Sequence, residues 1–421
     1  MKIIPELRFP EFEKEGQWVI ERLDRVVSNF IVPMRDKPKK LDGPIPWCRI
    51  EDFDGMYLSS SKSNQGVSLE TIEEMNLKVY PVNSLLVSCS ADLGRCAITA
   101  KELVTNQTFI GLVPNTRKAN TIYLYFIMSN SRNELNARSS GTTISYLSRQ
   151  EFEKFEIPIP PDEDCLEQQK IASCLSSLDE LIAAHKDKLD ALKDHKKGLL
   201  QNLFPQEGET VPKVRFPEFE GDGEWEIKRV EDFFDVGSSK RVLQKDWTND
   251  GVPFYRTREL VSLSKNEPFG SEIFISEDLY IELKESYGVP VEGDFLVSGV
   301  GTLGVIYQVK KEDKFYFKDG NVIWFSKREE LDSSFFEFCF ESSHIQNQID
   351  AQTSKSTVGT YTIKNARITE FWHPPRIEEQ QKIASCLSAV DELITAQQDK
   401  IEQLQQHKKG LMQGLFPKIK S

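Results

Sequence analysis

The 421-residue sequence lacks the patterns that would place a catalytic centre in it. It has no G-x-x-x-x-G-K-[ST] phosphate loop, no H-E-x-x-H zinc motif and no paired Cys/His metal spacing, so we expect neither ATP hydrolysis nor zinc chemistry. The proline pairs in Ile159-Pro-Pro-Asp162 and His373-Pro-Pro-Arg376 lack the flanking Asn or Asp and the aromatic residue of an amino-methyltransferase tetrapeptide. We therefore expect no catalysis, no metal and no cofactor in this chain itself.

Cysteine pairs and long apolar runs are also missing. The seven cysteines form no C-x-x-C pair, and an odd number argues against a secreted disulfide framework, so we interpret them as free thiols. No segment approaches the roughly 18 apolar residues of a membrane span, and the first sixteen residues are charged rather than apolar. We expect a globular protein of the cytoplasm that does not enter a membrane.

An excess of positive charge is absent as well, since the formal net charge is -13. Residues 1–160 hold 20 basic and 20 acidic side chains, whereas residues 206–375 hold 20 and 31. Binding to a phosphate backbone needs Lys and Arg, so the net charge alone does not favour a nucleic-acid partner. If DNA is the ligand, basic side chains must cluster locally, and partner subunits must supply much of the attraction to phosphate.

An internal repeat organises the chain. Residues 167–205 and 379–417 share 27 of 39 positions at a fixed offset of 212. Weaker echoes precede each copy: Arg8–Phe12 returns as Arg215–Phe219, Trp18 as Trp225, Leu85–Ser88 as Phe295–Ser298, and Gly94 as Gly304. Each half is therefore a variable domain followed by a nearly invariant segment.

The repeated segment has the 4-3 apolar spacing of a coiled coil, which predicts two helices of about 37 residues, each roughly 55 Å long. Pro205 and Pro417 end them. The predicted seam consists of Ile171, Leu175, Leu178, Ile182, His185, Leu189, Leu192 and Leu199 in the first copy, and of Ile383, Leu387, Val390, Ile394, Gln397, Ile401, Leu404 and Leu411 in the second. His185 and Gln397 occupy equivalent places, where a polar residue fixes register rather than performing catalysis.

The two seams are expected to bury each other as an antiparallel coiled coil, because a pseudo-two-fold axis that also relates the variable domains requires that pairing. The predicted fold is α+β, with two mixed α/β domains joined by two long helices. The expected boundaries are 1–160 and 206–375 for the variable domains, and 161–205 and 376–421 for the helical regions.

Within the variable halves, β-branched and aromatic runs predict strands, and longer amphipathic runs predict helices. Strands are expected at 84–88, 108–113, 295–298 and 322–325, and helices at 121–138 and 333–352. Proline-rich stretches at 157–161 and 373–375 are expected to form stiff extended connectors. Gly299–Gly304 matches G-x-G-x-x-G, but a strand rather than a helix follows it, so we expect a turn between strands instead of a nucleotide site.

Basic and hydroxyl residues in expected loops are the candidates for contact with DNA, because Arg and Lys recognise guanine edges while Lys and Ser hold phosphates. In the first half they are Arg35, Lys37, Lys39, Lys40, Arg49, Lys62, Ser139, Ser140 and Thr142. In the second half they are Lys240, Arg241, Lys245, Arg256, Arg258, Lys355 and Thr357. Taken one at a time, each is equally a solvated surface residue.

The repeat itself, EQQKIA at 167–172 and 379–384 with HKKGL at 195–199 and 407–411, resembles the conserved regions of type I restriction-modification specificity subunits. Ile45-Pro-Trp47 and Val252-Pro-Phe254 look like the family's [IV]-P-[WF] strand, and residues 139–142 resemble its S-x-G-T turn. The second half departs from that turn, with Thr-Val-Gly-Thr at 357–360 and a shorter exit.

The resemblance implies one target-recognition domain in each half, each recognising one part of a bipartite, asymmetric double-stranded DNA site. It also implies that the helices act as a spacer and dock two modification subunits. Those subunits carry S-adenosylmethionine and methylate an adenine that is flipped out of the duplex. Restriction and translocase subunits, with their ATP and Mg²⁺, would join the complex to cut unmodified phage DNA. The alternative is a scaffold that binds proteins rather than DNA, which the acidity of residues 206–375 favours.

Overall fold

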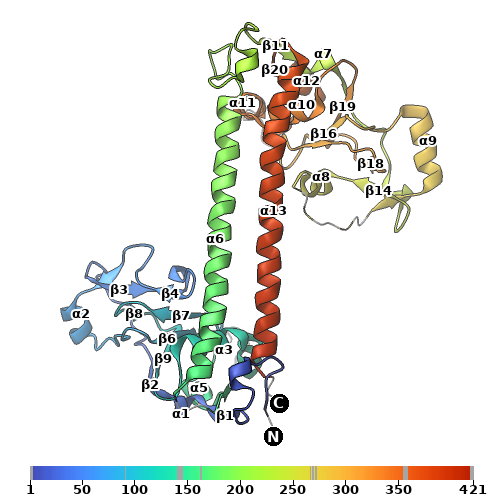
Figure 1. The fold of residues 1–421 in the computed structure, drawn as a ribbon. Helices are drawn as coiled ribbons and strands as arrows, with labels where there is room; N and C mark the ends of the chain where they lie inside the picture. The colour runs from blue at the N-terminus through green and yellow to red at the C-terminus, as the bar shows by residue number, and fades with distance from the viewer. Residues whose placement is uncertain are drawn as a thin grey trace. The chain divides into compact units, whose positions relative to one another are not determined.

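The computed structural model describes residues 3–90, 92–139, 146–161, 164–265, 267, 270, 273–353 and 359–417. The chain divides into two compact units, one of Met1–Lys186 with Asp399–Ser421 and one of Asp187–Gln398. Each unit contains a mixed α/β domain and part of each of two long helices, α6 (Leu166–Asn202) and α13 (Ile377–Leu415) (Figure 1). The predicted α+β class, with two domains and two long helices, is confirmed.

The first unit is built on a five-stranded sheet in the order β2-β9-β6-β7-β4, with a three-stranded sheet β5-β3-β8 and a two-stranded sheet β1-β10. The strands are β1 Val19–Arg22, β2 Val27–Ile31, β3 Ile45–Cys48, β4 Tyr57–Leu58, β5 Gly66–Val67, β6 Leu85–Ser88, β7 Cys96–Thr99, β8 Val104–Thr105, β9 Phe109–Pro114 and β10 Glu156–Ile159. The shorter helices are α1 Leu23–Val26, α2 Leu69–Glu74, α3 Thr121–Asn130, α4 Arg132–Arg138 and α5 Arg149–Glu153.

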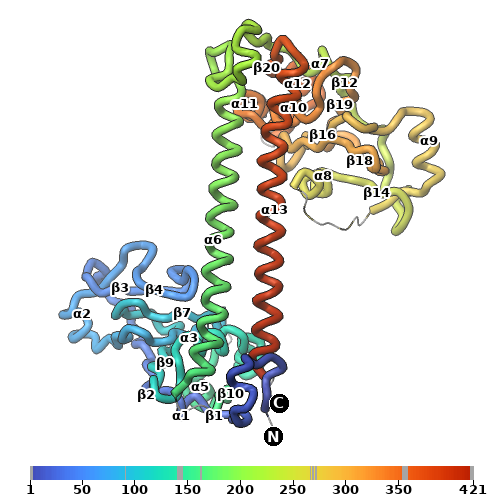
Figure 2. Tube along the Cα trace, viewed as in Figure 1, coloured from blue at the N-terminus to red at the C-terminus, as the bar shows by residue number. Residues whose placement is uncertain are grey.

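Helix α3 lies in the core of this unit and contacts β6 and β7. Five of its ten residues are buried, on more than one face, because the same apolar core also contains Ile171 and Leu175 of α6 and Phe416, which follows α13. The N-terminal segment runs beside the end of α13, where the Leu7 N–H donates to the Gly414 carbonyl at 2.9 Å (Figure 2).

The second unit contains two four-stranded sheets, β12-β19-β16-β17 and β13-β15-β14-β18, and a two-stranded sheet β11-β20. The strands are β11 Glu226–Arg229, β12 Phe234–Gly237, β13 Trp247–Thr248, β14 Val252–Tyr255, β15 Phe274–Ile275, β16 Phe295–Ser298, β17 Ile306–Gln308, β18 Tyr316–Phe317, β19 Val322–Lys327 and β20 Glu370–His373. The shorter helices are α7 Val230–Phe233, α8 Thr257–Ser264, α9 Glu277–Tyr287, α10 Ser333–Glu341, α11 Ser343–Thr353 and α12 Ile363–Ile368.

Two details differ from the sequence prediction. The helices expected at 121–138 and 333–352 are each split in two, at Ser131 and at Ser342. Ser131 leaves the helical conformation with ψ 10° while its hydroxyl donates to the Ile127 carbonyl, and Ser342 is extended with ψ 154°. The connectors are also partly strands, because β10 pairs with β1 and β20 with β11.

Each unit pairs the start of one long helix with the end of the other. In the first unit Ile171 and Leu175 of α6 share a core with Leu415 of α13, and in the second Leu203 shares one with Ile383. The helices therefore run antiparallel, as predicted. Every predicted seam position is buried or partly buried.

Each long helix is fastened to its own domain by a buried glutamine in its first turn. The Gln168 side chain accepts from the Asn120 N–H and donates to the Lys118 carbonyl, both at 3.0 Å. Gln380 accepts from the Asp332 N–H at 3.0 Å. Asn120 and Asp332 are the N-caps of α3 and α10. Equivalent glutamines therefore join equivalent pairs of helices, α6 with α3 in the first unit and α13 with α10 in the second.

The glycine-rich segment 299–304 is a turn between the antiparallel strands β16 and β17, as predicted. Gly304 has φ +67° and its counterpart Gly94 has φ +81°, a backbone conformation that glycine adopts without strain. The turn therefore explains both glycines without a nucleotide.

Candidate nucleic-acid interface

In the first unit, two of the predicted cations meet on one aromatic ring. Trp47, near the end of β3, is only 3% exposed. The Lys37 Nζ lies 5.5 Å and the Arg49 Cζ 5.6 Å from its ring centroid, which are cation–π distances. The ring thus gathers charges from two separate loops at one place on the surface.

Lys37 also lines a hollow together with Lys39 and Lys40. The same hollow is lined by Asp36, Asp42, Ser68, Glu70, Thr71, Glu74 and Met75. Four carboxylates therefore face three ammonium groups, so the hollow itself is not a strongly positive surface. Arg35 is exposed on the same loop.

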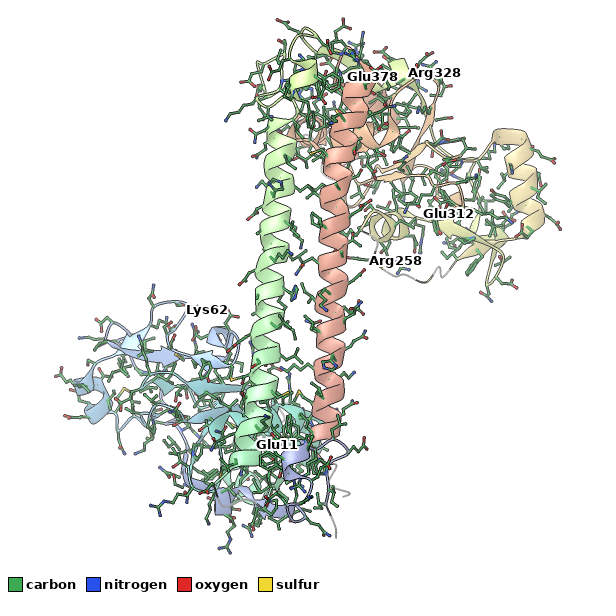
Figure 3. The ribbon with its side chains drawn as sticks, in the orientation of Figure 1. Glu11, Lys62, Arg258, Glu312, Arg328 and Glu378 are labelled. Carbon is green, nitrogen blue, oxygen red and sulfur yellow. The ribbon has the colours of Figure 1, made fainter. Side chains whose placement is uncertain are left out.

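Asp52 lies beneath the loop that carries Lys62. Its carboxylate is 3% exposed and accepts from the backbone N–H groups of Arg49 and Lys62, both at 2.7 Å. The Ser61 hydroxyl is a third donor at 3.4 Å. The Lys62 ammonium itself is exposed, with Asp54 as its acidic neighbour at 3.7 Å (Figure 3).

In the second unit, Lys240 lies against an exposed aromatic ring. Its Nζ is 5.1 Å from the ring centroid of Tyr287, the last residue of α9. Both residues line a small hollow that also contains Trp324. Arg241 pairs with Asp319 at 2.7 Å, and Lys245 is exposed in a short 3₁₀ turn.

Arg256 and Arg258 converge on one buried carboxylate, that of Glu259 in the first turn of α8. Arg256 donates from Nη2 to Oε1 at 2.8 Å and from Nε to Oε2 at 3.2 Å, and Arg258 donates from Nε to Oε1 at 3.2 Å. Burial alone raises the pKa of Glu259, but hydrogen bonds from Arg256 outweigh it and hold the pKa below its usual range. Figure 3 labels Arg258, whose side chain remains 61% exposed.

Of the remaining candidates, Ser139 lies within the described residues. Ser139 directly follows α4, and its hydroxyl donates to the Asn136 carbonyl at 2.7 Å. Ser140, Thr142, Lys355 and Thr357 lie outside the described residues.

The sequence prediction missed Asp52 and Glu259, two buried acids that accept from the backbone N–H groups of Arg49 and Arg256. Both follow the [IV]-P-[WF] strand, and each stands three residues after its arginine. The sequence signal is the spacing: an acid three residues after the end of a strand can accept from the backbone N–H at that end.

Two searches of the described residues returned nothing. No cluster of three or more His, Cys, Asp or Glu side chains there could hold a metal ion. No helix within the described ranges is long and apolar enough to cross a membrane.

Comparison with known sequences gives a consistent family. The family model of the type I restriction modification DNA specificity domain matches the chain twice, over residues 32–194 and 222–406. The type I restriction enzyme MjaVIII specificity subunit of Methanocaldococcus jannaschii is 23% identical over 400 residues, covering 92% of this chain and 91% of that protein. The MjaIX specificity subunit of the same organism is 29% identical over 270 residues, covering 62% and 61%.

Solved structures agree at the level of the fold. A type I restriction-modification S subunit from M. genitalium has a TM-score of 0.60 at 14% identity and covers 99% of this chain and 100% of that chain. A chain from a structural study of complex assembly and conformational transition in a type I R-M system has a TM-score of 0.59 at 17% identity, covering 95% and 97%. Because the family model matches well over half of the chain, the protein belongs to the type I restriction-modification specificity family, whose subunits recognise DNA sequence.

Proposed function

We propose that this chain recognises a bipartite, asymmetric site in double-stranded DNA, one part with each variable domain. It acts without catalysis, as the recognition subunit of a complex that methylates adenine or restricts unmodified DNA. It carries no cofactor itself. S-adenosylmethionine belongs to the modification subunits, and ATP and Mg²⁺ belong to the restriction and translocase subunits.

The observation that carries this proposal is that one scaffold presents two different surfaces. Gln168 and Gln380 fasten equivalent helices to equivalent N-caps, so the two domains are built alike. The loops beyond them differ: Trp47 gathers cations in the first unit, whereas Glu259 gathers them in the second. Equal scaffolds with different contact residues are what an asymmetric, two-part site requires.

We propose that two modification subunits dock at equivalent exposed positions of the long helices. Leu181 and Leu393 stand at the same position of the repeat, and both are large apolar side chains left exposed, at 44% and 56%. Packing within either unit does not require them to be leucine. Their identity in both copies supports one partner protein that binds twice.

The test is selection of duplexes from a library with randomised half-sites and spacer lengths, using the chain assembled with its modification subunit. We expect a bipartite, non-palindromic site. Replacing residues 1–160 with those of another family member should change one half of that site and leave the other unchanged.

Recovery of random duplexes by the intact complex would contradict sequence recognition. It would favour the protein scaffold that the acidic excess of residues 206–375 supports. A change in both half-sites after the domain replacement would contradict independent recognition by the two domains.

A further inference from the structure

The arginines that follow β3 and β14 are each accompanied by a buried acid at the same spacing. Arg49 and Arg256 come directly after the two strands, and Asp52 and Glu259 follow three residues later. Each acid accepts from the backbone N–H of its arginine, at 2.7 Å and 3.0 Å. The two sites are therefore equivalent in the fold although the acids differ by one methylene.

Both carboxylates need partners, because they are only 3% and 2% exposed. Removing an ionised carboxylate from water costs several kcal/mol unless hydrogen bonds or an opposite charge compensate it. The compensating groups are thus held in place, because breaking their hydrogen bonds or ion pairs to the acid would leave a buried charge unpaired.

The compensating groups differ between the two units. Asp52 is satisfied by N–H and hydroxyl donors of the loop 61–62, and no guanidinium contact to it is found among the described residues. Glu259 is satisfied by the guanidinium groups of Arg256 and Arg258. In the first unit the acid therefore fixes the backbone that carries Lys62, and in the second it fixes the Arg258 side chain.

Each held residue also presents its charge to solvent. The Lys62 side chain is 55% exposed and that of Arg258 is 61% exposed, whereas Arg256, nearer to Glu259, is only 30% exposed. Asp52 thus fixes the backbone position from which the Lys62 side chain extends, and Glu259 fixes the Arg258 guanidinium itself. Such preorganisation favours selectivity, because less conformational freedom is lost on binding.

We infer that Asp52 and Glu259 are positioning residues for DNA recognition, which hold Lys62 and Arg258 ready to contact the half-site of their own unit. The inference rests on the proposed function. Arg256 belongs to the support of Arg258 and is not itself the contact.

Neutralising each acid separates positioning from charge. Asp52→Asn and Glu259→Gln keep shape and leave every cation in the chain, so affinity for random duplex should change by no more than about twofold. Selectivity should fall about tenfold at one or more base pairs, which is within the discrimination that one well-placed base contact provides. The loss should lie in one half-site for Asp52→Asn and in the other for Glu259→Gln.

Lys62→Ala and Arg258→Ala remove the positioned charges themselves. They should relax the same base pairs as the corresponding acid variants and should also lower the salt dependence of binding by about one phosphate contact if the charge touches the backbone. Because these residues are exposed, both variants are expected to fold, which keeps the inference testable if an acid variant does not.

Asp294→Asn is the matched control. Asp294 is 1% exposed and accepts from the Val291 and Lys327 N–H groups and from the Trp324 Nε1, so its replacement tests the loss of a buried acid away from Lys62 and Arg258. It should lower the unfolding temperature without changing the selected bases.

Library selection with the assembled complex gives the decision. If the native complex selects a bipartite site but Lys62→Ala and Arg258→Ala leave it unchanged, the inference is wrong and the proposed function stands. If either acid variant relaxes both half-sites equally, or Asp294→Asn relaxes the bases as well, positioning is again excluded. If the native complex selects no site, the proposed function itself fails.

Discussion

Arg8 holds Glu167 through two parallel hydrogen bonds, from Nε to Oε1 and from Nη2 to Oε2, both at 2.7 Å. The Trp18 Nε1 donates to the same Oε1 at 3.2 Å. The carboxylate is fully buried in the first turn of α6, while Arg8 lies 159 residues earlier in the chain. This pair ties the N-terminal segment to the start of the long helix.

The second unit repeats the arrangement. Arg215 pairs with Glu379 at 2.8 Å through both Nε and Nη2, and the Trp225 Nε1 donates to Oε1 at 3.3 Å. Hydrogen bonding to Glu379 raises the pKa of Arg215 although burial opposes it. The echo of Arg-Phe-Pro-Glu-Phe before each domain therefore has a structural cause.

Arg8→Ala should lower the free energy of unfolding of the first unit by about 3 to 5 kcal/mol, because it leaves the Glu167 carboxylate buried without its partner. Arg215→Ala should do the same in the second unit. Urea unfolding of the full chain, followed by near-ultraviolet circular dichroism, measures both.

The double variant Arg8→Met, Glu167→Met is the control. It should be clearly more stable than Arg8→Ala, because no charge is left unpaired in the core. Equal stability of the two variants would show that lost packing, rather than the uncompensated carboxylate, dominates the effect.

The sequence predicted the long helices well because a 4-3 spacing over ten turns leaves few alternatives, and Pro205 and Pro417 mark where it stops. It did not predict the breaks at Ser131 and Ser342, because serine is tolerated within helices and only tertiary packing decides whether the chain turns there. The proline-rich exits were expected as connectors because their partner strands, β1 and β11, are remote in sequence.

The candidate interface followed a similar pattern. Residue type was enough to propose Lys37 and Arg49, but not that they meet on Trp47, since that contact joins two loops in space. Nor could the sequence distinguish Arg256, held at the edge of a buried acid, from the more exposed Arg258. The partners of surface charges depend on tertiary structure, so these contacts cannot be predicted from sequence patterns.

The stability of the second unit should depend on Glu337 in mildly acidic solution. Burial, together with Glu341 and Asp391, raises the pKa of Glu337 to about 7, although Lys196 and Lys310 oppose the shift. The folded chain therefore keeps a proton that the unfolded chain has lost, and stability falls as the pH rises from about 4.5 to about 7. Thermal unfolding across that range measures the fall.

Glu337→Gln isolates this contribution, because glutamine cannot ionise. The difference in stability between the native chain and the variant should change across the window and be constant above it. Tyr125 holds the equivalent place in the first unit, so Tyr125→Phe is the control that should leave the acidic range unaffected. A constant difference between the native chain and Glu337→Gln from pH 4.5 to 7 would contradict the raised pKa.

Two equivalent lysines, Lys196 and Lys408, should contribute differently to the free energy of unfolding. Lys196 contacts two carboxylates, Glu341 at 3.0 Å and Asp391 at 2.9 Å, whereas Lys408 pairs with one carboxylate, that of Asp179. The two lysine side chains are similarly exposed, at 18% and 21%. Lys408→Met should cost about 1 kcal/mol, because it breaks a single, partly exposed ion pair.

Lys196→Met should cost about 2 to 3 kcal/mol, between a surface pair and a buried one, because it leaves two carboxylates facing Glu337. Denaturant unfolding of both variants under identical buffer gives the comparison. Equal losses would mean that the additional acids of the second unit are solvated in solution.

Leu181→Asp and Leu393→Asp test the proposed docking of two modification subunits. Each places a charge where an apolar contact is expected, so each should reduce the complex from two modification subunits to one, and the double variant should bind none. Native mass spectrometry at saturating partner measures the stoichiometry. Val211→Asp, at an exposed apolar residue outside the long helices, is the control and should leave two modification subunits bound. If the double variant still binds two modification subunits, the docking surface lies elsewhere.

Trp47 should contribute to DNA binding through the cations that lie on its ring. Trp47→Leu removes the ring while keeping an apolar side chain, so Lys37 and Arg49 lose a contact worth about 1 kcal/mol or less each, and affinity for the selected duplex should fall about tenfold. Trp47→Phe keeps an aromatic ring that attracts cations less strongly, so its affinity for the selected duplex should lie between those of the native chain and Trp47→Leu.

Because Trp47 is buried, its replacement also opens a cavity. The variants Lys37→Ala, at an exposed residue, and Arg49→Ala, at a half-buried one, separate the two effects. Each should reduce the slope of log binding constant against log salt by about 1 if its charge contacts a phosphate, with a smaller change in unfolding temperature than Trp47→Leu. Filter binding between low and physiological salt measures the slope. If both variants keep the native slope and affinity while Trp47→Leu weakens binding, the ring supports the fold of the first unit and its cations do not touch DNA.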